Sequence, residues 1–463
     1  MTEPRHIAVI DIGKTNAKLA LVDLATPSEI AVVTRPNVVL PGPPWPHFDI
    51  EGHWRFILKA LARFHNEHGI DAISITTHGA CAALLSEDGK LAAPILDYEH
   101  EYGPETVKDY ARLKPDFIFT GSPALAGGLN IGAQLHWQFT TDPSLKSRTK
   151  QIVTYPQYWG HRLTGVAATD VTSLGCHTDL WNPHDQTFSD LPAKLGIHDK
   201  IAPVRRPGDI LGPILPEIAQ TTGLDPQTPV CVGIHDSNAS LYPHVISQAG
   251  PASVVSTGTW VIAMSLTGDT THDIPPLDLD RDTLINVNAL GQAVASARFM
   301  GGREYEVIQN GQNEAPSRRD VDAVRDAPLM LLPSVEPGSG PFQGRNMQWL
   351  GHEPPVGSGQ RSVALSYYLA LMTGTCLKLI GAAGPTIVEG PFARNAEFIE
   401  MLKAITDRPV YTSEASTGTS IGAALLFTKD QTLASPTEAG IRGDKLELAA
   451  YAARWNDTVK ASR

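Results

Sequence analysis

The 463-residue sequence has few cysteines, a shortage of basic residues and no long apolar run. Its four cysteines lie far apart without a CxxC pair, which is typical of reduced thiols and argues against a zinc site. Lys and Arg number 37 against 49 Asp and Glu, which gives a formal net charge of −12. Because nucleic acid and anionic membranes attract basic surfaces, this balance argues against both as partners.

No apolar run is long enough to cross a bilayer, so we expect no membrane partner. The first residues lead directly into a predicted strand, and we therefore expect no signal peptide and a cytoplasmic location. The chain does contain 42% hydrophobic and 19% charged residues, which is the composition of a globular protein. At this length two domains of about 200 residues each are the natural expectation.

A short stretch near the start, residues 7–18, organises the rest of the sequence. An apolar run reaches Asp11 and a polar turn at Gly13, and alternation then resumes, which predicts two strands joined by a tight turn. Gly13 allows a ligand to approach the backbone closely, and Asp11 at the strand end is placed to hold a hydrated cation. An ordinary β-hairpin turn is the alternative. Turns of this kind hold phosphate oxygens through amides and hydroxyls, here those of Lys14, Thr15 and Asn16.

The strand predicted over 70–77 ends in the sequence Thr-His-Gly, which places His78 and Gly79 just beyond it. Open α/β sheets bind ligands at the carboxyl ends of their strands, so His78 is a candidate substrate contact. The alternative is a histidine that only satisfies a structural hydrogen bond.

The segment 94–102 gathers three acids, a histidine and two tyrosines in a loop. Asp97 could accept hydrogen bonds from the hydroxyls of a polyol while Tyr98 covers a carbon face of the same ligand. A solvated acidic loop is the alternative.

A buried-looking strand over 229–234 delivers His235 and Asp236 to the start of a predicted helix. A carboxylate at such a corner can act as a general base if a hydroxyl comes within hydrogen-bond reach. Capping of the helix is the alternative, because Asp, Ser and Asn are all good N-caps. Ser237 or Asn238 could take the cap and leave Asp236 free.

The segment 252–266 repeats the plan of residues 7–22, with a strand, a Thr-Gly-Thr turn and a second strand. The pair predicts two halves built alike, each offering a phosphate-binding turn to a shared cleft, and favours nucleotide phosphates as the ligand. Further along, Gly301 and Gly302 allow close packing or ligand approach. Gly390 with Asn395 could hold the adenine and ribose of a nucleotide, with a tight strand-to-helix connection as the alternative.

Taken in order, these motifs resemble those of the FGGY carbohydrate kinases. The matching segments are DIGKTNAK at 11–18, GIHD at 233–236, STGT at 256–259, VEGPFARN at 388–395 and SIGAA at 420–424. The resemblance implies an α/β chain of two ribonuclease-H-like, actin-like (ASKHA) domains with a central interdomain cleft. ATP and Mg²⁺ would occupy one side and a sugar the other. We expect the sugar-side N-terminal domain over 1–243, the nucleotide-side C-terminal domain over 244–440 and a tail helix over 441–463.

Carried over residue by residue, the resemblance makes Asp236 the base that accepts the proton of a sugar hydroxyl. It places Asp11 near the Mg²⁺-bound phosphates, and Asp11 and Asp236 are the candidate Mg²⁺ ligands, through water. With the candidates above, the expected sugar contacts are His78, Gly79, Asp97, Tyr98, His235 and Asp236. The expected nucleotide contacts are Asp11, Gly13, Lys14, Thr15, Asn16, Lys18, Thr257, Gly258, Thr259, Gly301, Gly302, Gly390 and Asn395.

Three departures from the family pattern bear on substrate and mechanism. Lys14 stands where members commonly carry a small hydroxyl residue, so whether Lys14 or Lys18 approaches the phosphates stays open. The loop 96–101 lacks the Trp-x-Asp-x-Arg pattern of glycerol kinases, which argues against glycerol. The His-Asp form of the base motif is similar to that of deoxyketose kinases, such as rhamnulose and fuculose kinases. The alternatives are another polyol or pentulose kinase of the family, or an actin- or Hsp70-like ATPase without sugar transfer; a homodimer is left open.

Overall fold

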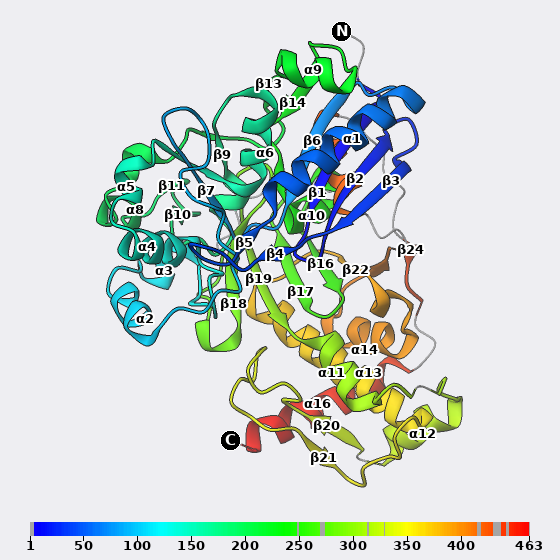
Figure 1. The fold of residues 1–463 in the computed structure, drawn as a ribbon. Helices are drawn as coiled ribbons and strands as arrows, with labels where there is room; N and C mark the ends of the chain where they lie inside the picture. Colours follow the sequence, from blue (N-terminus) through cyan, green and yellow to red (C-terminus); the bar gives the residue numbers. More distant parts are fainter. Residues whose placement is uncertain are drawn as a thin grey trace. The chain divides into compact units, whose positions relative to one another are not determined.

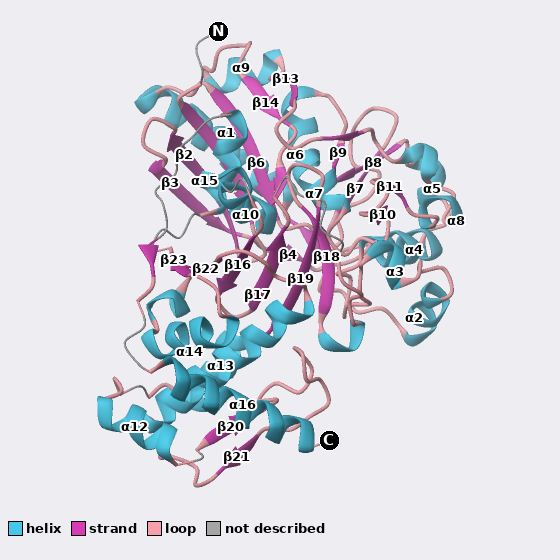
Figure 2. Cartoon of the chain, turned by 180° about the vertical axis from the view of Figure 1, so that it is seen from behind, coloured by secondary structure: helices cyan, strands magenta, loops and turns pink. Residues whose placement is uncertain are grey.

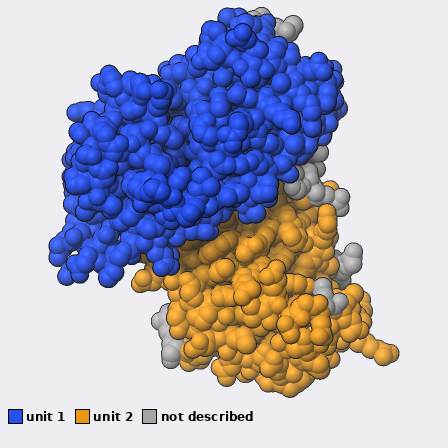
Figure 3. Space-filling model, in the orientation of Figure 1, with its two compact units in different colours: residues 1–247, 285–293, 417–433 blue, residues 248–284, 294–416, 434–463 orange. Residues whose placement is uncertain are grey.

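The computed structural model describes residues 4–247, 250–268, 274–312, 314–327, 329–413, 418–428, 437–440 and 444–462. The chain divides into two compact units, coloured separately in Figure 3. Unit 1 comprises residues 1–247, 285–293 and 417–433, and unit 2 comprises residues 248–284, 294–416 and 434–463. The domain limits expected from the sequence stay a prediction.

Unit 1 is built on a sheet with the strand order β13-β14-β6-β1-β2-β3, in which β15 also pairs with β6. Strands β1 (His6–Ile12), β2 (Asn16–Asp23) and β3 (Ser28–Pro36) form an antiparallel meander, and β6 (Ala72–Thr77) runs parallel to β1. The strands at the other edge are β13 (Ile210–Pro213), β14 (Pro229–Cys231) and β15 (Ile234–His235). Because β1 is apolar on both faces, it suits a central position with both faces covered.

Helices cover both faces of this sheet (Figures 1 and 2). On one face, α1 (Ile50–His68) and α6 (Tyr155–Thr164) pack against side chains such as Ile10. On the other face, α10 (Asp236–Ser247) and α15 (Thr419–Ala424) pack against side chains such as Val9. The apolar residues of α1 recur at helical spacing, and Gly165 closes α6 in the left-handed conformation.

A second group of elements in unit 1 has its own apolar core. Its larger members are β7 (Ala82–Leu85), β8 (Gln151–Thr154), α2 (Pro104–Ala111), α3 (Phe117–Thr120), α4 (Ile131–Thr141), α5 (Leu145–Arg148) and α7 (Val171–Leu174). The smaller ones are β9 (Thr169–Asp170), β10 (Trp181–Asn182), β11 (Thr187–Phe188), β12 (Val204–Arg205) and α8 (Leu191–Lys194). Elsewhere in unit 1 lie β4 (Val39–Leu40), β5 (His47–Phe48) and α9 (Pro216–Thr222).

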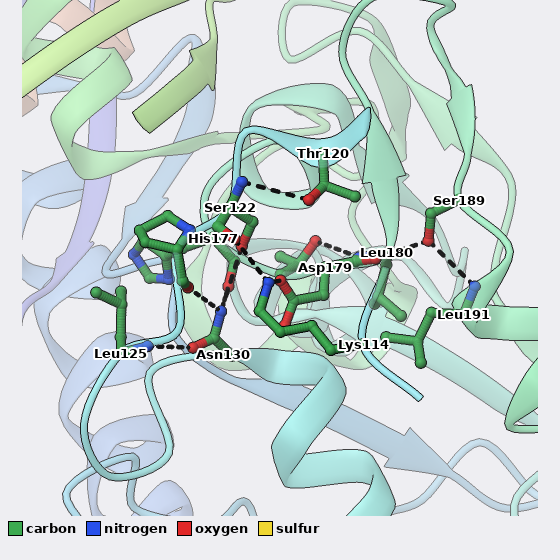
Figure 4. A network of polar contacts seen from close by, with 12 residues as sticks. Lys114, Thr120, Ser122, Leu125, Asn130, His177, Asp179, Leu180, Ser189 and Leu191 are labelled. Atoms are coloured by element: carbon green, nitrogen blue, oxygen red, sulfur yellow. Dashed lines mark hydrogen bonds and ion pairs between the residues drawn. The ribbon is translucent and has the colours of Figure 1, made fainter. Parts of the chain in front are cut away.

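A buried ion pair ties the loops of this second group together (Figure 4). The Lys114 ammonium lies 2.7 Å from Oδ1 of the fully buried Asp179, and the Tyr110 hydroxyl donates to the other carboxylate oxygen at 2.6 Å. The Asn130 amide donates to the backbone oxygens of Pro123 and His177, each at 3.0 Å. These contacts fix the chain around Cys176, which lies beside His235 in the site described below.

Unit 2 contains a sheet with the strand order β18-β19-β17-β16-β22-β23-β24. The strands are β16 (Ala252–Thr257), β17 (Val261–Leu266), β18 (Thr283–Val287), β19 (Ala293–Phe299), β22 (Thr386–Glu389), β23 (Val410–Thr412) and β24 (Thr437–Glu438). As in unit 1, an antiparallel hairpin continues into parallel strands, here β16, β22 and β23. The two halves are therefore built alike, as the repeated hairpin predicts.

Helices α11 (Gly301–Gln309), α12 (Arg318–Asp326), α13 (Gly359–Leu379), α14 (Ala396–Thr406) and α16 (Lys445–Ala461) complete unit 2. A small hairpin of β20 (Met330–Leu332) and β21 (Gln348–Leu350) packs with them. The long apolar pattern of α13 is buried along most of its length, because it lies in the core of this unit. Across the described residues of both units, no helix combines the length and the apolar character needed to cross a bilayer.

Candidate active site

The turn between β1 and β2 brings Asp11 opposite Lys18 across the hairpin. The Lys18 ammonium lies 3.1 Å from Oδ2 of Asp11 and 3.2 Å from Oε1 of Glu29. The turn is closed by a hydrogen bond of 2.9 Å from the Gly13 amide to the Asn16 carbonyl. The positive charge of Lys18 is therefore shared between Glu29 and Asp11, the carboxylate predicted to lie at the phosphate site.

Thr419, which sequence reasoning missed, also contacts Asp11. Its hydroxyl donates to Oδ2 of Asp11 at 2.6 Å, and the Ser420 hydroxyl lies 3.4 Å from the same oxygen. Thr419 is the first residue of α15. The signal in the sequence is a pair of hydroxyl residues at the start of a small-residue helix, but nothing in the local sequence identifies their partner.

Lys14 extends to the acidic loop and contacts the predicted sugar residues. Its ammonium lies 2.5 Å from Oδ1 of Asp97 and 2.9 Å from Oε2 of Glu99. It also lies 4.7 Å from the centre of the Tyr98 ring, within the range of a cation–π contact. The structure thus groups Lys14 with Asp97 and Tyr98, and leaves Lys18 with Asp11.

His78 lies at the end of β6 among aromatic rings. The centres of the Phe48, Tyr98 and Tyr155 rings are 5.3, 5.0 and 4.8 Å from the centre of its own ring. Burial lowers the pKa of His78 to about 3, so the imidazole is neutral. Neither ring nitrogen has a hydrogen-bond partner among the described residues, which leaves both available to a ligand. The role of His78 as a sugar contact stays a prediction.

Asp236 is the first residue of α10. Its Oδ1 accepts the Ser237 amide at 2.6 Å and lies 3.1 Å from Nε2 of His235. The side chain is 29% exposed, and burial raises its pKa to about 7, with the charge of Asp11 contributing in the same direction. A carboxylate with such a pKa is suited to accept a proton near neutral pH. Helix-end bonding and proton acceptance need not compete, because the first uses Oδ1.

His235 and Gly79 fit closely together. The His235 side chain is buried, and burial lowers its pKa to about 4. A Cβ atom at Gly79 would lie 2.6 Å from Cδ2 of the His235 ring. Gly79 therefore makes room for the ring beside Asp236, a role that the sequence alone does not reveal.

In unit 2 the second predicted phosphate turn lies between β16 and β17. The buried Thr257 hydroxyl accepts the Phe392 amide at 3.1 Å and donates to the Glu389 carbonyl. Gly390 has a φ of +82°, and a Cβ atom there would lie 2.0 Å from the Thr257 carbonyl oxygen. The Thr257 hydroxyl is therefore used by the backbone of its own unit.

The remaining candidates of unit 2 gather around the same turn, with one exception. The Gly302 amide donates to the Thr259 carbonyl at 3.2 Å, and a Cβ atom at Gly302 would lie 2.0 Å from the Gly258 carbonyl oxygen. Gly301 packs against Val261 and Phe299. Asn395 instead caps α14, accepting the Phe398 amide at 3.0 Å and donating to the Ser366 hydroxyl at 2.9 Å. Its role in nucleotide binding stays a prediction, since capping already accounts for both ends of its amide.

The carboxylates of unit 1 fit a phosphate-bound magnesium ion better than a closed metal site. Among the described residues no group of three or more His, Cys, Asp or Glu side chains is placed to hold a metal ion. Mg²⁺ in phosphoryl-transfer sites keeps several waters and takes one or two carboxylates, with substrate phosphates completing the shell. Asp11 and Asp236, which lie close enough for the charge of one to raise the pKa of the other, could supply those carboxylates.

Comparison with known proteins gives consistent matches over the whole chain. The model of the N-terminal domain of the FGGY family of carbohydrate kinases matches residues 6–242, and the model of the C-terminal domain, named carbohydrate kinase FGGY, matches residues 249–436. The crystal structure of a carbohydrate kinase from Novosphingobium aromaticivorans has a TM-score of 0.91 and 36% identity, and covers 98% of this chain and 100% of that one.

Two curated relatives match over a shorter span. An L-fuculokinase from Salmonella typhi is 24% identical over 270 residues, which is 57% of each chain. A rhamnulokinase from Mannheimia succiniciproducens is 25% identical over 213 residues, 44% of this chain and 41% of that protein. The chain thus spans about half the length of the curated relatives it matches. The two family models and the structural match confirm the resemblance and the two-domain actin-like fold expected from the sequence. The chain belongs to the FGGY family of carbohydrate kinases.

Proposed function

We propose that the protein transfers the γ-phosphoryl group of ATP to a hydroxyl of a sugar, with Asp236 as the general base. The observation that carries the proposal is the state of the Asp236 carboxylate. Its Oδ1 accepts the Ser237 amide at 2.6 Å and lies 3.1 Å from Nε2 of His235, and burial raises its pKa to about 7. General bases work best with a pKa near the operating pH, because they are then deprotonated yet basic enough to take a proton.

In the proposed step the acceptor hydroxyl attacks the γ-phosphorus in line. A bond forms between the acceptor oxygen and phosphorus, the bond from phosphorus to the β–γ bridging oxygen breaks, and ADP leaves. The hydroxyl proton passes to Asp236, which later releases it to water. When bound, Mg²⁺ neutralises charge on the phosphate oxygens. Asp11 and Asp236 are the proposed carboxylates facing it, and Lys18 is the proposed phosphate-binding lysine, because Lys14 is bound to the acidic loop.

The proposed acceptor is a ketose, with 6-deoxyketoses such as L-rhamnulose and L-fuculose as the first candidates. An L-fuculokinase and a rhamnulokinase are among the relatives, and the His-Asp form of the base motif points the same way. The proposed sugar contacts in unit 1 are His78, Gly79, Asp97 and Tyr98. Unit 2 supplies the second phosphate motif of the proposal, Thr257, Gly258 and Thr259. The proposal includes a cytoplasmic location.

The test is a coupled ADP-release assay with ketopentoses, 6-deoxyketohexoses and polyols as acceptors. The expected result is ATP turnover that depends on one class of sugar and on Mg²⁺. ATP turnover that no sugar stimulates would contradict the proposal and favour an ATPase without sugar transfer. Mass spectrometry of the product identifies the sugar phosphate and, after fragmentation, the phosphorylated hydroxyl.

A further inference from the structure

The imidazole of His235 lies between the base Asp236 and a polar side chain one helical turn later. Its Nε2 is 3.1 Å from Oδ1 of Asp236, and its Nδ1 is 3.5 Å from Nδ2 of Asn238. A neutral imidazole carries a single N–H. A carboxylate oxygen accepts, so an N–H on Nε2 faces Oδ1 of Asp236 as a close polar contact, and Nδ1 is left to accept from the Asn238 amide. The other group near Nε2, the Cys176 sulfur at 4.0 Å, is a weak acceptor at a longer distance.

Contacts from other parts of unit 1 position the backbone at His235 and leave room for its ring. The His235 amide donates to the Thr172 hydroxyl at 3.0 Å, and that hydroxyl donates in turn to the fully buried Asp170. Gly79 leaves the space in which the ring lies. The Gln157 amide donates to the carbonyls of Val232 at 3.0 Å and Gly233 at 3.2 Å, which anchors the strand that leads into His235.

We propose that His235 is a positioning residue for the Asp236 carboxylate. With the Ser237 amide it holds Oδ1 in place, so that Oδ2 is presented to the proton of the acceptor hydroxyl. This inference rests on the proposed function, and it differs from the direct sugar contact that the sequence suggests for His235. The two roles separate in kinetics: a positioning contact acts on turnover, whereas a sugar contact also changes KM.

The first test compares His235→Leu with His235→Gln. Leucine removes the donor, whereas glutamine keeps an N–H that can reach the carboxylate. His235→Leu is expected to lower kcat by about tenfold to a hundredfold, the range for small losses of alignment, with KM for sugar and ATP within about twofold. His235→Gln is expected to restore most of kcat. His161→Leu and His161→Gln are the matched controls, because His161 is a half-buried histidine of the same unit whose Nε2 faces the Gly89 carbonyl at 2.9 Å.

The second test changes residues that surround the His235 ring and leaves His235 itself unchanged. Gly79→Ala places a methyl group against the ring and is expected to lower kcat as His235→Leu does, with KM for the sugar little changed. A rise mainly in KM would instead assign the effect to the proposed sugar contact of Gly79. Thr172→Val removes the hydroxyl that receives the His235 amide, and Thr149→Val, which removes a buried hydroxyl bonded to the Leu145 carbonyl, is its control. Thermal melting and ADP binding by calorimetry establish that each variant is folded.

Full turnover in a folded His235→Leu variant would overturn the proposal, and so would a loss found mainly in KM for the sugar, which would assign His235 to sugar binding. A measurement that needs no turnover distinguishes failure of the positioning role of His235 from failure of the proposed function. Nitrogen NMR of ¹⁵N-histidine-labelled protein, assigned with His235→Gln, is expected to show the Nε2-protonated tautomer at His235. The Nδ1-protonated tautomer would overturn the proposal whatever the protein phosphorylates, whereas absence of sugar-dependent turnover in the wild type would overturn the proposed function.

Discussion

Thr419 donates a hydrogen bond of 2.6 Å to Asp11, a residue 408 positions earlier in the chain. The helix that begins at Thr419 packs tightly onto the sheet of its own unit, since the Ser74 hydroxyl donates to the Ala423 carbonyl at 2.7 Å. A Cβ atom at Gly422 would lie 1.7 Å from the Ala239 carbonyl oxygen. A segment from the last tenth of the sequence therefore completes the surroundings of the carboxylate at the first phosphate turn.

Replacing Thr419 by valine should weaken this anchoring. Valine keeps the shape of threonine but removes the hydroxyl, and a hydrogen bond to a charged group contributes about 1.5–3 kcal/mol. We expect Thr419→Val to lower the free energy of unfolding by an amount in this range, measured by urea denaturation at pH 7.5. Thr419→Ser keeps the hydroxyl and serves as the control. A valine variant as stable as the wild type would show that the hydrogen bond makes no net contribution.

Replacing Asp236 by asparagine should separate chemistry from binding. The amide cannot accept the proton of the acceptor hydroxyl, so kcat is expected to fall at least about a hundredfold, in line with general-base contributions. Nucleotide affinity, measured by calorimetry with ADP and Mg²⁺, should stay nearly unchanged. Full activity in this variant would remove Asp236 from its role. Asp88→Asn is a control, because Asp88 lies in an exposed turn of the same unit.

Local pattern was enough to predict the elements that carry the site. The hairpins follow from alternating apolar residues on both sides of a glycine turn. Helices α1 and α6 follow from the spacing of nearby apolar residues and from the glycines that end them. The ordered motifs then assign the two-domain fold, because the family keeps them in the same sequence. The same motif order makes Asp236 the predicted base, and that role stays a prediction.

Several pairings within the site could not be predicted, because they join residues far apart in the chain. Lys14 binds Asp97 across 83 positions, and nothing near Lys14 distinguishes this partner from a phosphate group. Gly79 looks like a glycine that lets a ligand approach, yet its free space is taken by the His235 ring. Asn395 is a residue type that often contacts ligands, but its side chain caps helix α14. The sequence shows which side chains could bind a ligand, whereas their contacts in the fold determine which of them are already bonded to other residues.

Gly390 should tolerate no side chain, for two separable reasons. Its φ of +82° disfavours any residue with a Cβ atom, and that atom would also lie 2.0 Å from the Thr257 carbonyl oxygen. Gly344 has a similar φ of +77° but open space around it, so Gly344→Ala measures the first cost alone. We expect Gly344→Ala to cost about 1–2 kcal/mol of unfolding free energy and Gly390→Ala clearly more. Equal losses in the two variants would show that the β16–β17 turn moves aside without cost.

His53 should make the protein less stable in mild acid. The side chain is fully buried; its Nδ1 lies 2.9 Å from Nη1 of Arg35, and its Nε2 lies 2.8 Å from Oδ1 of Asn37. Burial, helped by the positive charge of Arg35, lowers the pKa of His53 from 6.5 to about 4. Between these two values the unfolded chain binds more protons than the folded one, so the stability is fully present above pH 6.5 and declines as the pH falls toward 4.

The loss attributable to His53 should reach on the order of 2 kcal/mol at pH 5, from the linkage between the two pKa values. Many carboxylates titrate in the same range, so the measurement is a difference between proteins. Urea denaturation of the wild type and His53→Gln at pH 7.5 and pH 5 should show the two stabilities converging or crossing as the pH falls, because glutamine takes up no proton. His184→Gln, at an exposed histidine, should leave the pH dependence of the wild type nearly unchanged. A constant difference between wild type and His53→Gln at both pH values would mean that the folded chain protonates His53 as readily as the unfolded chain does, contrary to the lowered pKa.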